Sequence, residues 1–104
     1  MSQNRYKVTR NVLKVLSNVL ADEIDDNFEE CCKELLASDA QNLVIDFGNV
    51  GYASSICVVM AAKIFFETRR SNRKLRIRAK KSVLKIFKMC GFDYDERISL
   101  EQTD

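Results

Sequence analysis

The order of hydrophobic and polar positions predicts strands in three parts of the chain. Residues 6–17 mix valines, leucines and a tyrosine with polar residues, a β-rich composition with a break at Asn11, which predicts two short strands or one bent strand. Residues 43–47 form a short apolar run that is typical of a buried strand. In residues 75–79 apolar side chains alternate with Arg76 and Arg78, so we expect this strand to have one solvated face.

A helix is predicted between the first and second of these parts. Apolar residues recur there at steps of four, three and four, which places them on one helical face. They are Ile24, Phe28, Cys31 and Leu35. Acidic residues crowd the expected first turn, where the helix dipole favours negative charge, and we interpret them as a helix start rather than a metal site. They are Asp22, Glu23, Asp25 and Asp26.

A second helix is expected over residues 56–70, after a loop at 48–53. Ser54 or Ser55 stands where the N-cap of this helix belongs. We expect Phe65 and Phe66 to lie in the core together with Phe87, with part of the surface of the second helix left exposed.

The third helix has the clearest boundaries. Ser82 is the expected N-cap, and Gly91 stands where a left-handed closing residue belongs. Its apolar stripe consists of Val83, Leu84, Ile86, Phe87 and Cys90.

This order of elements predicts an α/β fold with helices packed on a mostly parallel or mixed central sheet. A strand, a helix and a strand in succession make a right-handed crossover, so residues 43–47 and 75–79 are expected to be neighbouring parallel strands. Residues 95–104 are polar and are expected to be a frayed tail or a short final strand. With 104 residues the chain is large enough for one core and too small for two, so we expect one domain over residues 1–104 with a polar tail from about 95.

The composition argues against an enzyme. The chain has no histidine, so the usual proton shuttle at neutral pH and the commonest metal ligand are missing. It also lacks a C-x-x-C pair and an H-E-x-x-H motif, and its three glycines are too few for a glycine-rich phosphate loop. We therefore expect a binding or regulatory protein without a catalytic site, metal or cofactor.

Apolar runs and cysteines bear on the compartment. No apolar run approaches the ~20 residues of a membrane-spanning helix, and no apolar stretch follows a basic start at the N-terminus. We therefore expect a cytoplasmic protein without membrane insertion. The cysteines should then be reduced and mostly buried thiols. They are Cys31, Cys32, Cys57 and Cys90.

Charge is unevenly distributed along the chain. Residues 1–53 carry five basic and nine acidic side chains, whereas residues 54–104 carry twelve basic and six acidic ones. Much of the positive charge lies in one run that contains no acid, which is a solvated face, a surface for an acidic protein or a nucleic-acid site. Nucleic acid is the least expected partner, because no aromatic residue is interleaved for base stacking. The run consists of Arg69, Arg70, Arg73, Lys74, Arg76, Arg78, Lys80 and Lys81.

Two motifs of the second half occur in a known family. The segment NLVIDFGNVGYASSICVVM runs from a strand that ends in Asp46, through a loop, to a helix that Ser54 and Ser55 open. A later segment, VLKIFKMCGFD, fits the pattern V-x-x-L-L-x-x-x-G-L-D through Val83, Ile86, Phe87, Gly91, Phe92 and Asp93. Residues 43–93 thereby resemble strongly the core of a STAS domain, the fold of bacterial anti-sigma-factor antagonists, and the residues before them resemble it weakly.

The resemblance implies a regulatory role. In that family, the serine that follows an aspartate at this helix start is phosphorylated by a partner kinase that is itself the anti-sigma factor. The matching position is Ser54, and Ser55 is the second candidate. A serine at a helix start is also an ordinary cap, worth about 1 kcal/mol, so both roles stay open for Ser54.

Two functions follow from the resemblance. The first is a STAS-like interaction domain that binds a kinase-type anti-sigma factor or an equivalent switch partner. The second is a constitutive accessory subunit of a transport or stress-sensing assembly, which Ala53 and Ile56 favour because they replace the family's Asp and Gly. For either function we expect one partner surface at the loop and helix start, formed by Asn49, Tyr52, Ser54, Ser55, Ile56 and Val58.

Overall fold

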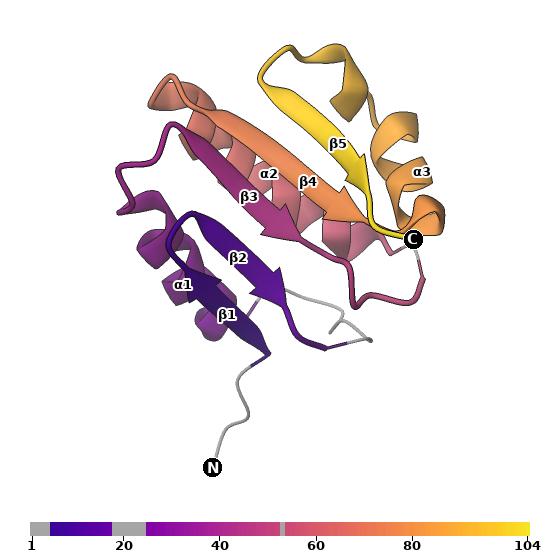
Figure 1. Cartoon of the computed structure of the whole chain (residues 1–104), viewed down its shortest axis with the longest axis horizontal. Coiled ribbons are helices and arrows are strands. Elements are labelled where there is room, and N and C mark those ends of the chain that lie inside the picture. Colours follow the sequence, from indigo (N-terminus) through magenta and orange to yellow (C-terminus); the bar gives the residue numbers. More distant parts are fainter. Residues whose placement is uncertain (1–4, 18–24, 53) are drawn as a thin grey trace.

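The computed structural model describes residues 5–17, 25–52 and 54–104, which form one α/β layer structure (Figure 1). Five strands build a mixed sheet, and three α-helices connect the strands that run parallel. The elements are β1 (Tyr6–Thr9), β2 (Val12–Val15), α1 (Asp26–Leu36), β3 (Asn42–Asp46), α2 (Ser55–Arg70), β4 (Lys74–Ala79), α3 (Lys81–Met89), the short 3-10 helix η1 (Phe92–Tyr94) and β5 (Ile98–Gln102).

The strands lie in the sheet in the order in which they occur in the chain. β1 and β2 pair antiparallel around a turn in which Arg10 adopts a positive φ of 56°, so the prediction of two short strands is confirmed. β2, β3, β4 and β5 all pair parallel. The expected parallel pairing of residues 43–47 with 75–79 is confirmed as β3 with β4, with Ile45 opposite Ile77.

All three helices cover the same face of the sheet (Figure 1). Right-handed crossovers that always step in one direction place every helix on one side. This helix-covered face is apolar along each strand, through residues such as Leu13, Ile45 and Ile77, which are fully buried. The side chains that alternate with them form the other side, called the open face. It consists of Lys7, Thr9, Val12, Lys14, Asn42, Val44, Asp46, Lys74, Arg76, Arg78, Ser99 and Glu101.

Helix α1 begins at an acidic cap, as its composition indicated. The side chain of Asp25 accepts a hydrogen bond of 2.8 Å from the backbone N–H of Phe28. Phe28, Cys31 and Leu35 are buried as predicted, and the ring of Phe28 packs edge-on against Tyr6 at a centroid distance of 5.3 Å. The predicted positions Asp22, Glu23 and Ile24 lie outside the described residues.

Helix α3 differs from the prediction at its start. Its N-cap is Lys80, not Ser82, which lies exposed within the first turn. The backbone N–H of Lys81 instead donates a 2.9 Å hydrogen bond to Asp104 Oδ1, so a carboxylate at the end of the described chain stabilises this helix start. The closing role of Gly91 is confirmed by its φ of 83°, whereas the preceding Cys90 is exposed and not part of the buried stripe.

One expectation about the core is wrong, and one of two alternatives for the end of the chain is confirmed. Phe87 is fully buried and Phe65 partly so, but Phe66 is 66% exposed, because it lies on the outer face of α2 two turns beyond the exposed Val59. The chain from residue 95 is also no polar tail. It contains β5, whose Ile98 and Leu100 pack against the core, so the alternative of a short final strand is confirmed.

The four cysteine thiols were expected to be mostly buried, and no membrane-spanning helix was expected. Cys31, Cys32 and Cys57 are buried and Cys90 is exposed, which confirms the expectation of mostly buried thiols. Within residues 5–17, 25–52 and 54–104, no helix combines the length and the apolar character needed to cross a membrane.

Candidate functional site

The predicted contact surface lies at the carboxyl edge of the parallel strands, where β3 passes into α2. Open α/β sheets commonly bind their ligands at this edge. The connection is anchored from inside by Phe47 and Val50, which are buried and joined by a 2.9 Å backbone hydrogen bond. Asn49 and Tyr52 are exposed on the outside, Tyr52 to 50%. The apolar residues of the loop thus fix it to the core, and Asn49 and Tyr52 are exposed to solvent.

Asp46 shapes the first part of this loop. Its Oδ1 accepts a 2.7 Å hydrogen bond from the backbone N–H of Gly48. A Cβ at position 48 would lie only 2.9 Å from the same oxygen, so a larger residue would force the Asp46 carboxylate to shift. Its Oδ2 lies 3.3 Å from Arg78 Nη1, an ion pair with the neighbouring strand. The aspartate that ends β3 therefore has a structural role in placing the loop.

A row of alternating charges continues from Asp46 across the open face. Lys14, Asp46, Arg78 and Glu101 are successive register partners on β2, β3, β4 and β5. Arg78 Nε lies 2.9 Å from Glu101 Oε2 without the alignment of a hydrogen bond, so this attraction is ionic. Opposite charges on adjacent strands favour this register.

The start of α2 is capped by Ser54, which confirms its predicted structural role. Ser54 has extended backbone angles, and its Oγ accepts a hydrogen bond of 3.4 Å from the backbone N–H of Ile56. This bond is longer than the 2.8 Å cap of α1, and the first turn of α2 contains no acidic residue. The positive end of the α2 dipole is therefore stabilised only weakly by its own side chains.

The predicted contact residues at this helix start differ in their exposure. Ser55 is exposed, Ser54 and Val58 are half-buried, and Ile56 is only 7% exposed because its side chain packs into the core. Ile56 therefore anchors the helix start to the core and, contrary to the prediction, offers almost no surface to a partner. Ala53 lies outside the described residues.

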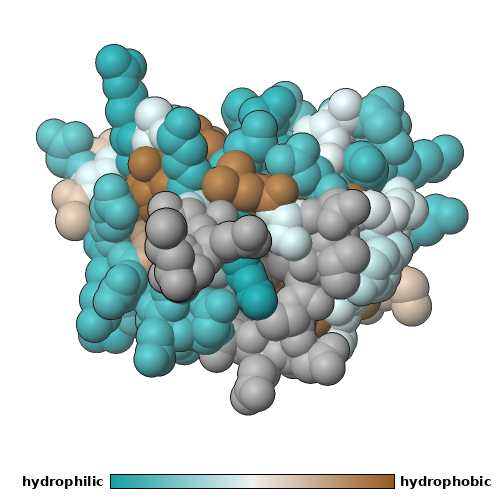
Figure 2. Space-filling model, turned by 90° about the horizontal axis from the view of Figure 1, so that it is seen from below, coloured by the Kyte–Doolittle hydropathy of each residue, from teal (hydrophilic) through white to brown (hydrophobic). Residues whose placement is uncertain are grey.

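Sequence reasoning missed Val59, one turn after Ser55 and 47% exposed. The first turns of α2 are apolar almost all round, so their periodicity does not separate inward from outward positions. The only available signal was the spacing of four from an exposed serine. Figure 2 shows one face of the molecule, on which a small hydrophobic area lies between hydrophilic side chains.

The basic run divides among several elements and is not one surface. Arg69 and Arg70 end α2, whereas Lys74 and Arg76 belong to the open face of β4. Arg73 serves the fold: its Nη1 and Nη2 donate hydrogen bonds of 2.7 and 3.0 Å to the carbonyl oxygens of Ser38 and Leu36, at the C-terminal end of α1. A cation that binds these carbonyls satisfies acceptors that the helix leaves open.

The buried thiols of Cys32 and Cys57 are poorly suited to chemistry at neutral pH. Burial raises the pKa of Cys57 to about 11 and that of Cys32 to about 12. Thiolate is the nucleophilic form, so these groups are almost entirely unreactive thiols in the folded protein. In the part of the chain that the structure describes, no group of three or more Cys, Asp or Glu side chains is placed to hold a metal ion.

Comparison of the whole chain with models of protein families, with curated proteins and with solved structures gave no match.

Proposed function

We propose that this protein is a regulatory interaction domain of the STAS type, without catalytic activity, which binds a protein partner through the start of α2 and the loop before it. One observation carries the proposal. A serine-capped helix start without acidic residues lies beside the exposed side chains of Tyr52 and Val59, at the carboxyl edge of the sheet. The preferred partner is a kinase-type anti-sigma factor or an equivalent cytoplasmic switch protein.

The helix start is suited to carry a phosphate on Ser54 or Ser55. A phosphate adds a charge of about −1.5 to −2 and three acceptor oxygens, which the free N–H groups and the positive dipole end of α2 would stabilise. No acidic residue in the first turn of α2 opposes that charge. The modification is thus compatible with the fold, while it changes the charge of the contact surface.

The surroundings of the serines are suited to a protein contact. Tyr52 and Val59 expose about half of their surface on either side of Ser54 and Ser55 in the chain. Tyrosine is enriched at interfaces because it combines a large apolar ring with a polar end. A partner seated on these side chains would exclude water from the serines, so an added phosphate there would be costly to bury.

Capture of the partner from the native host tests the proposal. The bait proteins are the unchanged chain, Ser54→Ala, Ser54→Asp, Ser55→Asp and, as a matched control, Ser82→Asp in the exposed first turn of α3. We expect Ser54→Asp to reduce capture by at least about tenfold, because it places an unpaired charge in the contact. Ser54→Ala and Ser82→Asp should capture the partner normally, although Ser54→Ala should lose about 1 kcal/mol of stability with the cap.

Phosphopeptide mass spectrometry on the captured chain completes the test. Phosphate on Ser54 or Ser55 supports the switch. If no phosphate is found under any growth condition and Ser54→Asp captures as well as Ser82→Asp, the switch is excluded, and the alternative of a constitutive docking subunit replaces it. If Tyr52→Ala and Val59→Ala also leave capture unchanged, the contact surface itself is refuted.

A further inference from the structure

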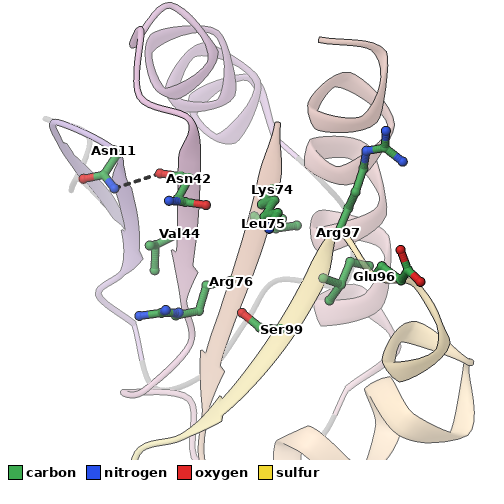
Figure 3. Close-up of a pocket in the computed structure, with 10 residues that line it drawn as sticks. Asn11, Asn42, Val44, Lys74, Leu75, Arg76, Glu96, Arg97 and Ser99 are labelled. Carbon is green, nitrogen blue, oxygen red and sulfur yellow. Dashed lines mark hydrogen bonds between the residues drawn. The ribbon is translucent and has the colours of Figure 1, made fainter. Parts of the chain in front are cut away.

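The open face of the sheet contains a hollow near the amino ends of β3, β4 and β5 (Figure 3). Its volume is about 520 Å³, which lies in the range of small-molecule sites. The strand register assembles it: Asn42 is opposite Lys74, and Val44, Arg76 and Ser99 are opposite one another on three successive strands. Residues separated by more than fifty positions thereby line one concave surface.

The floor and the charged wall of the hollow differ in chemistry. Val44 provides an apolar floor, and the side chain of Arg76 extends from β4 across β3 beside it (Figure 3). Lys74 precedes Arg76 by two residues on the same face, about 7 Å along the strand. Two cations with this spacing, next to the amide of Asn42 and the hydroxyl of Ser99, form a cluster of hydrogen-bond donors around one space.

Lys74 and Arg76 differ from the neighbouring arginines in having no partner in the described part of the fold. Arg73, Arg78 and Arg97 are all held by other residues of the fold: Arg73 by carbonyl oxygens, Arg78 by carboxylates, and Arg97 by Asn72 Oδ1 at 2.8 Å. Within the described residues, the side chains of Lys74 and Arg76 make no hydrogen bond or ion pair. Their donors are therefore available to a ligand.

The rim of the hollow is already ordered. Asn11 Nδ2 donates a 2.8 Å hydrogen bond to the carbonyl oxygen of Asn42, which ties the β1–β2 turn to β3. The bond between Arg97 and Asn72 fixes the opposite side. A rim that is fixed before binding lowers the entropy lost when a ligand is held.

We propose that this hollow binds the phosphate group of a small soluble molecule, such as a sugar phosphate or a mononucleotide. Arg76 offers a planar pair of donors that matches phosphate oxygens, and Lys74 adds a point charge. Asn42 and Ser99 donate to the remaining oxygens or to hydroxyl groups of the ligand. The carboxylate of Glu96, which also lines the hollow, favours a ligand that carries hydroxyl groups over one with several anionic groups.

A small ligand is favoured over a nucleic-acid strand. Among the described residues, no aromatic side chain lines the hollow, so bases would have no surface on which to stack. The charged row of Lys14, Asp46, Arg78 and Glu101 beyond it alternates in sign and does not continue a path for a phosphate backbone. Lys74 and Arg76 are therefore a local pair of cations within the hollow.

Titration of the isotope-labelled full chain, followed by NMR, tests the inference. The probes are inorganic phosphate, glucose 6-phosphate and AMP, with glucose as the uncharged control, at an ionic strength of about 0.15 M. We expect glucose 6-phosphate or AMP to shift the amide signals of Lys74, Arg76 and Ser99. Arg76→Gln and Lys74→Gln should each weaken binding by about tenfold. The matched control Lys14→Gln, on the same face but outside the hollow, should weaken it less than about twofold.

Several outcomes would overturn the inference. These are the absence of shifts at millimolar ligand, equal weakening by Arg76→Gln and Lys14→Gln, or tighter binding of a single-stranded RNA oligomer or an anionic lipid vesicle than of either phosphate ester. Arg76 is exposed, so thermal unfolding should show Arg76→Gln to be folded. Ser54→Asp should leave phosphate binding unchanged, so failure here is distinct from failure of the partner contact.

Discussion

The two faces of the sheet carry different kinds of residue on the same five strands. Toward the helices, Leu43, Ile45 and Ile77 are fully buried and contact a continuous core. Toward solvent, the alternating positions of the same strands include Lys14, Arg76 and other charged residues. One face of the sheet therefore buries the apolar core, whereas the other presents mostly polar and charged side chains.

The difference extends to how each face specifies the strand register. On the helix-covered face a slip by one residue would expose the whole apolar set. On the open face the same slip would separate Asp46 from Arg78 and Arg78 from Glu101. Both faces thus favour one register, and that register also places Lys74, Arg76 and Ser99 around the hollow.

Substitutions of two neighbouring residues of β4, one on each face, should differ most in their effect on the free energy of unfolding. Ile77→Ala should reduce the free energy of unfolding by about 2–5 kcal/mol, because it leaves a cavity under the helices. Arg76→Ala, one residue away on the open face, should change it by less than about 0.5 kcal/mol. Urea unfolding of both variants measures the difference. Equal losses would show that the open face contributes to stability as much as the core does.

The arginines of the basic run offer a second comparison. Arg73→Ala should cost about 1–3 kcal/mol, since it leaves the carbonyl oxygens of Leu36 and Ser38 without their charged donor. Arg69→Ala removes an exposed charge from the same run and should stay within about 0.5 kcal/mol. Thermal unfolding of the pair compares them directly. A larger loss for Arg69→Ala would contradict the structural role given to Arg73.

Chemical modification of the cysteines should distinguish the exposed thiol from the buried ones by their reaction rates, with the smallest effect on stability. At about pH 8 a thiol reagent should modify Cys90 rapidly and the three buried cysteines only as fast as the protein unfolds. Modification of Cys90 should change the free energy of unfolding by less than about 0.5 kcal/mol. Mass spectrometry of the intact chain over time counts the modified thiols, and rapid modification of Cys57 would contradict its burial.

The same thiols determine a pH dependence. The folded-state pKa of Cys57 is about 11 and that of Cys32 about 12, against 9.0 without burial. The unfolded chain therefore loses these protons first as pH rises. Their contribution to stability is fully present below pH 9.0 and should decline between there and about pH 11 to 12. Replacing Cys57 with alanine should reduce this alkaline decline.

Local patterns accounted for most of the fold. The alternation in β4, the helical spacing of Phe28, Cys31 and Leu35, and the left-handed Gly91 all depend on residues close in the chain. Two of the differences from the prediction occurred where a distant residue decides the structure. Ser82 was predicted as the cap of α3, but the carboxylate of the distant Asp104 accepts the hydrogen bond of the Lys81 N–H at this helix start. Residues 98–102 form a strand by pairing with β4.

The candidate sites show the same division. Ser54 could be predicted from its place before an apolar helix, because capping is a local property. The hollow on the open face could not, since Asn42, Arg76 and Ser99 meet only through the register of three strands. Charge alone also did not separate Arg73, which serves the fold, from Lys74 and Arg76, which lie on the open face.

The sequential order of the strands also has a consequence for how the chain folds. Each parallel strand joins the edge left by the strand before it, so none has to insert between two strands that are already paired. Each new pairing closes a loop of a single crossover, for which the entropic cost is modest. The sheet can therefore grow outward from the β1–β2 hairpin, and β5 completes it by bringing Asp104 to the start of α3.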